Sequence, residues 1–526
     1  MFRTAELGRK VSKEEFDRQA GPLRIELLEL QQTLRAADFP VILVFAGVEG
    51  AGKSESMNLL NEWLDPRWIV TRAYGPPSDE ERERPEFWRF WRDLPPKGRI
   101  GQFLSAWYSR PFMEFATAAI DDTTFDERMT RVQAFEKTLA DDGALILKFW
   151  MHLGKDAQKK RLKSLEKDPR QSWRVTAQDW KNWEMYDSFI RAAEQLIART
   201  SVSAARWTIV EGQDDRYRAL TVLFSLRDAL LHHLERRRLQ RQTRTEAYAS
   251  LVARDATGPG ARAAAGVGAG MGGQVLPNLV AGLPTVLDTL KMDSALEKKD
   301  YRAGLAQQQG RIALLQRRAR VQGVSTVLVF EGWDAAGKGG SIRRLTQALD
   351  ARQVQVIPVA APTDEERAQH YMWRFWRQLG RAGRVTVFDR SWYGRVLVER
   401  VEGFAAEDEW ARAYAEIRDF EEQMVQHGMV LCKFWLHITK DEQLSRFKTR
   451  EETPYKRWKL TEEDWRNREQ WEAYEHAINE MVERTSTHTA PWTLVEANDK
   501  RHARVKVIRT VADAMERAIG KPKGSG

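Results

Sequence analysis

The sequence predicts two α/β domains in tandem, each a doubly wound parallel sheet covered by helices. Short apolar runs that end in glycine, VILVFAG at 41–47 and VLVFEG at 327–332, suit strands buried on both faces of a parallel sheet. The segments between such runs have helical composition, and this alternation implies crossover connections. Ligands of such sheets bind at the carboxyl ends of the strands. The functional residues are therefore expected there.

A long internal repeat carries the tandem prediction. A shift of 285 positions pairs Lys53 with Lys338, and it pairs LKFWMHLGKD (147–156) with CKFWLHITKD (432–441). No gap is needed over roughly two hundred residues, a period far longer than the roughly 20–50 residues of solenoid repeats. The chain therefore contains a duplicated domain rather than an array of small units.

The domain boundaries follow from the repeat and from composition. We expect a first domain at residues 1–240 and a second at 285–526. The segment between them, 241–284, includes DATGPGARAAAGVGAGMGGQVLPN, which is rich in glycine and alanine and has no amphipathic period. This composition is typical of a linker or a surface loop.

Composition and charge limit the class of protein. Hydrophobic residues make up 42% of the 526 residues and charged residues 30%, and Cys432 is the single cysteine. No apolar run approaches the roughly 20 residues of a membrane span, and the first residues lack the apolar core of a secretory signal. These features predict a cytoplasmic protein without a disulfide framework. The net charge of +9 is compatible with a solvated surface or with a polyanionic ligand.

Each copy has a Gly-x-x-x-x-Gly-Lys loop between a predicted strand and a predicted helix. Glycines in such a loop let backbone N–H groups surround phosphate oxygens, and the helix N-terminus attracts the same anion. The first loop contains Gly47, Glu49, Gly52 and Lys53, and Ser54 completes the strict pattern. The second loop has Gly339 where the metal-binding hydroxyl is expected. By the loop alone, the first copy is the better candidate enzyme.

A second acidic motif reverses that preference. Phosphoryl transfer usually needs a carboxylate on a neighbouring strand to hold magnesium. Asp389 and Arg390 follow an apolar run in the second copy, and the first copy has Leu104 and Ser105 there. We therefore interpret the first copy as a diverged domain with a degenerate site. The alternative, that it recruits a metal ligand from elsewhere, stays open.

Five motifs in the second copy occur together in order: FEGWDAAGKGGSIRRL, FDRSWYGRVLVERVEGF, KFWLHITKDEQ, TPYKRWKLTEEDW and EANDKRHAR. Over residues 285–517 the chain closely resembles the polyphosphate kinase 2 family, and residues 5–235 look like a diverged member. The tandem is similar to the two-domain class of that family, the polyphosphate:AMP phosphotransferases. The resemblance implies a thymidylate-kinase-like P-loop fold with a helical lid.

The resemblance also implies roles for individual residues. The catalytic set would be Asp334, Lys338, Asp389 and Arg390, with Asp389 and Asp334 holding Mg²⁺ or, as an alternative, Mn²⁺. Further phosphate-binding positions would be Gly332, Gly337, Gly339, Gly340, Ser341, Arg343 and Arg344. A lid at 447–460 would add the cations Lys448, Arg450, Lys456, Arg457 and Lys459. The degenerate site of the first copy would comprise Gly47, Glu49, Gly52, Lys53 and Leu104.

The implied activity is transfer of the terminal phosphate of inorganic polyphosphate to a nucleoside monophosphate, chiefly AMP. Alternatives are transfer to ADP, an ATP-dependent nucleotide kinase and, least favoured, a polyphosphate-binding protein without turnover. The acceptor is expected to be an adenine nucleotide, with guanine as the alternative base. Membranes are not expected as partners, nucleic acid is disfavoured, and a homo-oligomer is compatible with the sequence.

Overall fold

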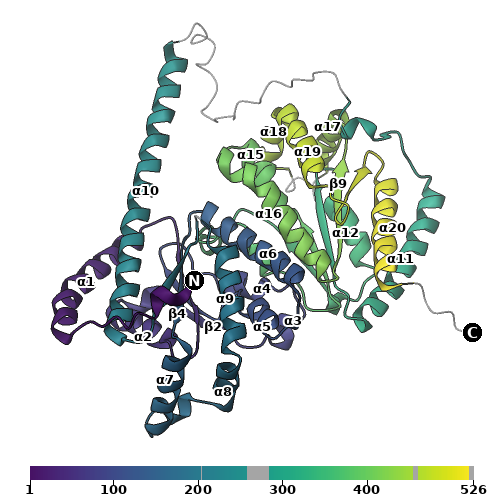
Figure 1. Cartoon of the computed structure of the whole chain (residues 1–526). Coiled ribbons are helices and arrows are strands. Elements are labelled where there is room, and N and C mark those ends of the chain that lie inside the picture. The colour runs from purple at the N-terminus through teal and green to yellow at the C-terminus, as the bar shows by residue number, and fades with distance from the viewer. Residues whose placement is uncertain (203, 258–283, 454–459, 521–526) are drawn as a thin grey trace, which may run out of the picture. The chain divides into compact units, whose positions relative to one another are not determined.

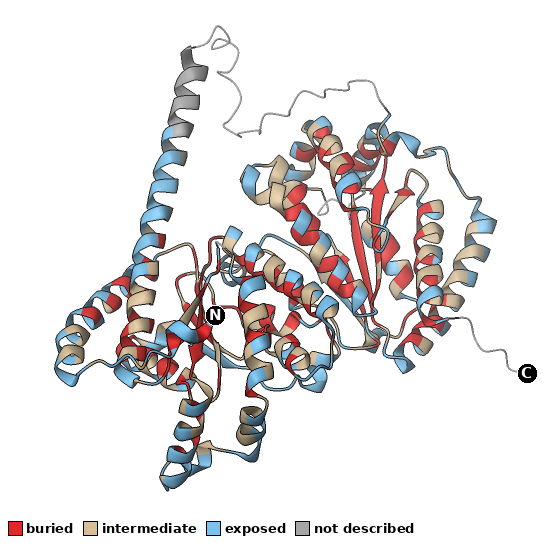
Figure 2. Ribbon diagram, in the orientation of Figure 1, coloured by how far each residue is buried: buried red, intermediate tan, exposed pale blue. Residues whose placement is uncertain are grey.

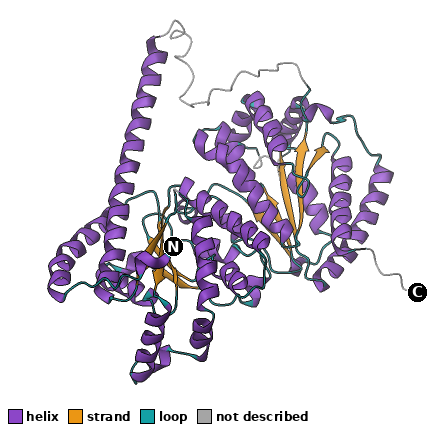
Figure 3. Cartoon of the chain, in the orientation of Figure 1, coloured by secondary structure: helices purple, strands orange, loops and turns teal. Residues whose placement is uncertain are grey.

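A computed structural model describes residues 1–202, 204–257, 284–453 and 460–520. It contains two five-stranded sheets in which every pair of neighbouring strands is parallel. The strand orders, β2-β3-β1-β4-β5 and β7-β8-β6-β9-β10, are equivalent in the two repeats. Figure 3 shows the strands of each sheet enclosed by helices. The predicted tandem of doubly wound parallel sheets is confirmed.

The strands agree closely with the apolar runs of the sequence. Buried side chains concentrate on the strands, as Figure 2 shows for both sheets. The first sheet consists of β1 (Val41–Gly47), β2 (Ile69–Ala73), β3 (Ile100–Leu104), β4 (Leu145–His152) and β5 (Trp207–Glu211). The second consists of β6 (Thr326–Gly332), β7 (Val354–Pro358), β8 (Val385–Asp389), β9 (Val430–His437) and β10 (Trp492–Glu496).

The helices of the two repeats also correspond (Figure 1). Those of the first repeat are α1 (Lys13–Leu34), α2 (Lys53–Trp63), α3 (Asp79–Arg82), α4 (Trp88–Asp93), α5 (Ser109–Ala116), α6 (Asp122–Asp141), α7 (Lys155–Lys167), α8 (Ala177–Glu184), α9 (Tyr186–Thr200) and α10 (Asp215–Thr257). Those of the second are α11 (Lys298–Val321), α12 (Lys338–Thr346), α13 (Asp364–Arg367), α14 (Trp373–Trp376), α15 (Val398–Val401), α16 (Glu407–Gln426), α17 (Lys440–Glu452), α18 (Glu462–Glu469), α19 (Trp471–Thr485) and α20 (Lys500–Ile519). Among the described residues, no helix is long and apolar enough to cross a membrane.

The chain forms two compact units. Unit 1 comprises Met1–Pro77, the described part of Phe90–Val267, and Asp364–His370. Unit 2 comprises Ser78–Arg89 and the described parts of Gly268–Thr363 and Tyr371–Gly526. Each unit thus includes one short segment of the other repeat.

The predicted linker at 241–284 coincides only in part with described residues. Helix α10 continues through residues 241–257, and residues 258–283 lie outside the described part of the chain. The division at 240 and 285 stays a prediction.

A buried ion pair joins the middle of each sheet to the helix that covers it. In unit 2, Nζ of Lys433 on β9 donates to Oε2 of Glu421 on α16 at 2.7 Å and to the Thr485 carbonyl at 2.8 Å. The other oxygen of Glu421 accepts hydrogen bonds from Trp392 Nε1 at 3.1 Å and Tyr393 Oη at 2.6 Å. Both ionic side chains are almost fully buried. This network fixes the turn that follows β8.

Unit 1 keeps the ion pair and its contacts to the indole and the carbonyl, but the hydroxyl of Tyr108, the counterpart of Tyr393, has no hydrogen-bond partner among the described residues. Lys148 Nζ donates to Glu136 at 2.8 Å and to the Thr200 carbonyl at 2.7 Å, and Trp107 Nε1 donates to Glu136 at 3.1 Å. Because the pair occurs in both repeats, it belongs to the fold rather than to the chemistry of one site.

His437, the last residue of β9, accepts two indole N–H groups. Its Nδ1 lies 3.2 Å from Nε1 of Trp333 and 3.4 Å from Nε1 of Trp435. A nitrogen that accepts these bonds carries no proton. Burial lowers the pKa of His437 from 6.5 to about 4, and the carboxylate of Asp288 opposes the shift only in part. His437 is therefore a neutral structural residue.

Removal of one partner of the buried pair should destabilise unit 2. Lys433→Met leaves the Glu421 carboxylate buried without its cation, so the free energy of unfolding should fall by about 3–5 kcal/mol. Chemical denaturation, with hydrogen exchange on β9 to identify the unit affected, measures this loss. The double variant Lys433→Met/Glu421→Gln should recover part of it, because the amide oxygen can still accept from Trp392. A loss below about 1 kcal/mol in the single variant would contradict this role.

The neutral state of His437 predicts a pH dependence of stability. Its folded pKa is lower than its unfolded value, so between pH 6.5 and about 4 the unfolded chain binds a proton that the folded chain excludes. Stability should therefore fall as the pH falls through this window, by up to about 3 kcal/mol from this residue. His437→Gln keeps an acceptor oxygen but does not titrate, so its denaturation midpoints should depend less on pH. Equal pH slopes for the two proteins would refute the assignment.

Candidate active site

The second phosphate loop lies at the carboxyl end of β6, the central strand of its sheet. Gly332 ends the strand and Gly337 precedes α12, with φ values of 150° and 110°. A Cβ atom on Gly332 would lie 2.5 Å from the Leu436 carbonyl oxygen, so the close approach of β9 requires glycine. Ala335 adopts the left-handed φ of 65°, at the position where the first loop has Gly50. The backbone is thus curled as a phosphate-binding loop requires.

Lys338 lies within this loop, among several charged side chains. Its Nζ donates to the carbonyl oxygens of Gly332 at 2.6 Å and Trp333 at 3.3 Å. Burial lowers the pKa of Lys338, whereas the nearby carboxylates of Asp334 and Asp389 favour its charged form.

Asp334 has a partner for each of its oxygens. Oδ1 accepts from Arg390 Nη2 at 3.2 Å, and Oδ2 accepts from Asn467 Nδ2 at 3.0 Å. Burial alone would raise the pKa of Asp334, but Lys338 and Arg390 outweigh it and hold the pKa below its usual value. Asp334 is therefore ionised near neutral pH.

The turn after β8 brings Asp389 and Arg390 to the loop. Asp389 lies opposite Phe330 in the register of β8 and β6, and the Arg390 amide donates to the Phe330 carbonyl at 3.0 Å. Arg390 has a φ of 64°, an uncommon conformation for a residue with a Cβ atom. The structure thus brings together the four residues of the expected catalytic set: Asp334, Lys338, Asp389 and Arg390.

Glu331, which the sequence analysis did not place in the site, is a fifth charged group. It is buried beside the loop and accepts a hydrogen bond from Ser391 Oγ at 2.7 Å. Burial raises the pKa of Glu331. The first repeat has Ala46 at this position, and this difference is the signal by which the sequence could have identified it.

The expected phosphate-binding residues of α12 follow the loop directly. Gly339 and Gly340 lie in the first turn, Ser341 is buried, Arg343 is exposed and Arg344 is half-buried. Sequence analysis missed Arg504 of α20, whose Nη2 lies 3.3 Å from the position of a Cβ on Gly340. This arginine is one helix turn into α20; it ends the motif EANDKRHAR, although the sequence analysis gave it no role.

The expected lid is described only in part. Lys448 and Arg450 lie on α17, and the charge of Arg450 helps to lower the pKa of Asp334. Lys448 is exposed. The remaining lid cations, Lys456, Arg457 and Lys459, lie outside the described residues.

An arginine of α17 holds the loop backbone. Arg446 donates to the carbonyl oxygens of Ala335 at 2.9 Å and Ala336 at 3.0 Å, and to those of Ala497 at 2.7 Å and Asn498 at 2.8 Å. The loop is therefore tied to the segment after β10 as well as to its own strand. In the sequence this residue does not distinguish the two repeats, because Arg161 occupies the same position in the first.

Asp389 and Asp334 fit a divalent cation by their chemistry. Magnesium prefers carboxylate oxygens and is commonly held by one or two carboxylates together with substrate phosphates. Among the described residues, no three or more His, Cys, Asp and Glu side chains form a cluster that could hold a metal alone. An ion at these two aspartates would complete its coordination with phosphate oxygens and water.

The loop of the first repeat has a similar backbone, but its lysine is paired with a carboxylate of the same loop. Lys53 Nζ donates to the carbonyls of Gly47 at 3.0 Å and Val48 at 3.1 Å, and to Glu49 Oε2 at 3.2 Å. Ser105 keeps the left-handed turn, with a φ of 56°, although Leu104 provides no carboxylate beside it.

A cavity of about 520 Å³ lies over this first loop and is bordered by Lys53 and Arg174. Arg174 forms an ion pair with Glu55 of α2 across it. The Arg218 guanidinium lies so close to Gly52 that a Cβ there would meet it at 2.3 Å, whereas Gly337 in the second loop has nothing within 4 Å. The first loop is thus crowded by its own side chains.

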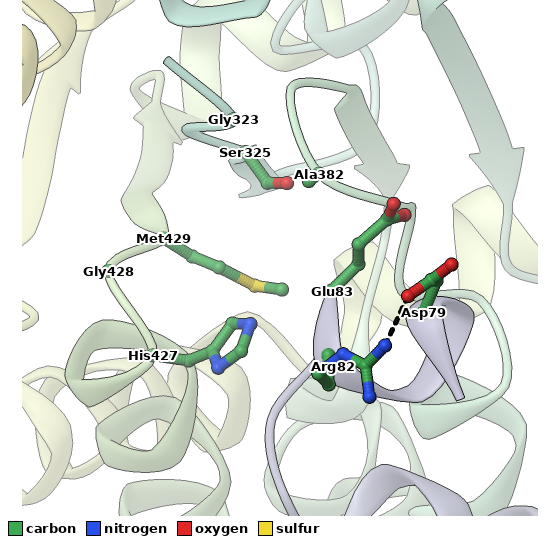
Figure 4. A pocket seen from close by; sticks show the side chains of 9 residues that line it. All are labelled: Asp79, Arg82, Glu83, Gly323, Ser325, Ala382, His427, Gly428 and Met429. Carbon is green, nitrogen blue, oxygen red and sulfur yellow. Dashed lines mark hydrogen bonds and ion pairs between the residues drawn. The ribbon is translucent and has the colours of Figure 1, made fainter. Parts of the chain in front are cut away.

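Unit 2 has a cavity of about 310 Å³ at the amino ends of its strands, opposite the end where the phosphate loop lies (Figure 4). Ser325, which precedes β6, and Met429, which precedes β9, line it together with Glu83. Because it lies at the amino ends of the strands, it is separate from the phosphate loop.

Comparisons with known proteins agree with this geometry. The family model described as polyphosphate kinase 2 matches residues 10–240 and again 295–522. A protein of Pseudomonas aeruginosa named polyphosphate:AMP phosphotransferase is 49% identical, over 99% of this chain and 100% of its own length. One of the same name from Pseudomonas syringae is 45% identical over 99% of this chain and 100% of its own. A solved polyphosphate kinase 2 structure from P. aeruginosa superposes with a TM-score of 0.84 at 47% identity, over 99% of this chain and 100% of that one. The chain therefore belongs to the polyphosphate kinase 2 family.

Proposed function

We propose that the second repeat transfers the terminal phosphoryl group of inorganic polyphosphate to a nucleoside monophosphate, chiefly AMP. The observation that carries this proposal is the convergence of Lys338, Arg390 and two aspartates on an open phosphate loop. The name that the two full-length relatives share, polyphosphate:AMP phosphotransferase, supports the choice of substrates. The sequence motifs and the family membership thus support the same pair of substrates.

The transfer breaks one phosphoanhydride bond and forms another. An oxygen of the AMP phosphate attacks the terminal phosphorus of the chain, and the penultimate phosphate leaves as the new chain end. The attacking oxygen is already ionised near neutral pH, because the second pKa of a phosphate monoester is about 6. The reaction therefore needs no general base, and the aspartates are free to act on charge and position.

The residues of the chain stabilise the charge that develops on the transferred group. Such transition states place negative charge on the equatorial phosphate oxygens, so catalysis is mainly positioning and neutralisation. Loop N–H groups, Lys338 and Arg390 would contact these oxygens. Asp389 and Asp334 would hold Mg²⁺, with Mn²⁺ as the alternative; a bound ion would supply positive charge to neutralise the phosphate oxygens.

The cations around this set would bind the rest of the polymer. Arg450 and Arg504 lie beside the loop, and Arg343 is exposed on the next turn of α12. A polyanion with about one charge per unit requires such a series of cations rather than a single one.

We further propose a division of labour between the domains at 1–240 and 285–526, with the linker at 241–284. The first domain would be a structural partner, because its loop lysine is paired with Glu49 and has no counterpart of Asp389. Cytoplasmic location and homo-oligomer formation stay predictions.

The activity is tested with AMP, ADP, GMP and GDP, each incubated with polyphosphate and Mg²⁺, and with the products separated by chromatography. We expect ADP from AMP as the main product. A preference for ADP, with ATP as the product, would favour the alternative acceptor. No transfer to any of the four would refute the proposal.

The roles of the two loops are tested with matched lysine variants. Lys338→Ala should lower kcat by about 10²-fold or more, because it removes a charge that stabilises the transition state. Lys53→Ala should keep most of the activity, since Lys53 is already paired within its own loop. Circular dichroism checks the folding of both. If the folded Lys53→Ala protein is as inactive as Lys338→Ala, the first loop is catalytic and the proposed division is wrong.

A further inference from the structure

One contact to Asp334 comes from outside the loop and its neighbouring strand. Asn467 on α18 donates from Nδ2 to Oδ2 of Asp334 at 3.0 Å. Only the NH₂ end of an amide can donate to a carboxylate, so Oδ1 of Asn467 must face the other way. The orientation of this side chain then depends on what donates to Oδ1.

Tyr474 on α19 supplies that donor. Its hydroxyl lies 3.2 Å from Asn467 Oδ1 and 3.3 Å from Glu402 Oε1. Burial, and then the carboxylate of Glu402, raise the pKa of Tyr474, so the hydroxyl keeps its proton at all ordinary pH values. Because the two acceptors lie at similar distances, the single hydroxyl proton is shared between them in a three-centre hydrogen bond, and it links Asn467 to Glu402.

Glu402 anchors the other end of this chain of contacts. Its side chain is only 6% exposed. Besides Tyr474, it accepts from Arg466 Nε of α18 at 2.8 Å and from Gln470 Nε2 at 3.1 Å. We call Asp334, Asn467, Tyr474 and Glu402 the relay; it joins the phosphate loop, α18, α19 and the end of α15.

An aromatic contact reinforces the same junction. The ring of Trp333 in the loop stacks on Trp471, the first residue of α19, with centroids 3.7 Å apart and an interplanar angle of 7°. Two contacts thus hold the phosphate loop against α18 and α19. One is the stacking of Trp333 on Trp471, and the other is the relay, which begins at Asp334, the residue after Trp333.

The first repeat has the same elements but lacks the relay. Phe189 stands in the place of Tyr474 and Thr117 in that of Glu402. Asn182 is retained, but its Oδ1 accepts from Gln178 of its own helix at 2.9 Å. Glu49 replaces Asp334 and binds Lys53 instead. The relay is therefore present in the repeat with the intact charge set and absent from the one without it.

We propose that Asn467, Tyr474 and Glu402 are positioning residues that hold α18 on the phosphate loop and fix the Asp334 carboxylate before substrate binds. A helix that is already docked does not have to be ordered when the polyphosphate arrives, so the apparent affinity for that substrate is higher. The effect on polyphosphate rests on the proposed function, whereas the docking of α18 does not.

The test uses the full-length chain and Tyr474→Phe. This substitution fits the fold, because the first repeat has Phe189 there, and it removes only the hydroxyl. Loss of the neutral hydrogen bond to Asn467 should by itself speed amide hydrogen exchange in α18 (Glu462–Glu469) by about 2- to 12-fold in the ligand-free protein. The contact to the Glu402 carboxylate is lost as well, so we expect at least this increase. The KM for polyphosphate should rise by a similar factor, with kcat changed less than about twofold.

Tyr414→Phe is the matched control. Tyr414 is also buried in unit 2, and its hydroxyl accepts from Arg400 of α15 at 2.8 Å rather than from a residue of the relay. It should leave exchange in α18 and the KM for polyphosphate unchanged. Asn467→Leu, which removes the donor to Asp334, should reproduce the effect of Tyr474→Phe on α18.

Two results would overturn the inference. Equal exchange of α18 in Tyr474→Phe and Tyr414→Phe would mean that the relay does not dock the helix. Faster exchange with an unchanged polyphosphate KM would mean that docking does not serve the site. If the chain does not use polyphosphate at all, the exchange measurement still judges the docking, so the two failures are distinguishable.

Discussion

The geometry of the site in unit 2 depends on the buried ion pair between Lys433 and Glu421. Lys433 lies on β9, beside the central strand β6, and its partner Glu421 also accepts from the N–H of Trp392 and the hydroxyl of Tyr393. Breaking any one of these contacts would leave a buried polar group unsatisfied, at a cost of about 1–3 kcal/mol or more. The turn after β8 is therefore rigid. That rigidity keeps Arg390 in its left-handed conformation, beside Asp334 and Lys338.

The same constraint explains why the first repeat still resembles an enzyme. Glu136, Lys148 and Trp107 repeat the network, and Ser105 keeps the left-handed turn. Leu104 stands where the second repeat has Asp389, and the network is kept because the side chain at this position takes no part in it. The residues that hold the turn in place are thus different from the charged residues of the proposed site. The charged residues can differ between the repeats while the turn keeps its structure.

Charge balance separates the two loops more clearly than loop sequence does. Around the second loop, Arg390 pairs with Asp334, whereas Lys338 donates to the carbonyl oxygens of Gly332 and Trp333. Around the first, the loop lysine itself is paired with a carboxylate: Lys53 binds Glu49, and Arg174 binds Glu55. A loop lysine that is already paired with a carboxylate must give up that partner to bind phosphate. The stricter loop motif of the first repeat is therefore the weaker indication of function.

The fold and the convergence of the four proposed site residues were predictable because they depend on local pattern and on topology. Apolar runs place β1 and β6 to within a residue, and a parallel sheet brings Asp389 to the loop because both lie at carboxyl ends of adjacent strands. Asn467 and Tyr474 were not predictable, since they are ordinary polar residues of amphipathic helices whose partners lie far away in the chain. Comparison of the two repeats does not identify Asn467 either, as its counterpart Asn182 shows. The residue is retained, but in the first repeat it bonds to its own helix. The same residue type at equivalent positions can therefore have different contacts in the two repeats. Its role is identified from the partner that it binds and not from the sequence position.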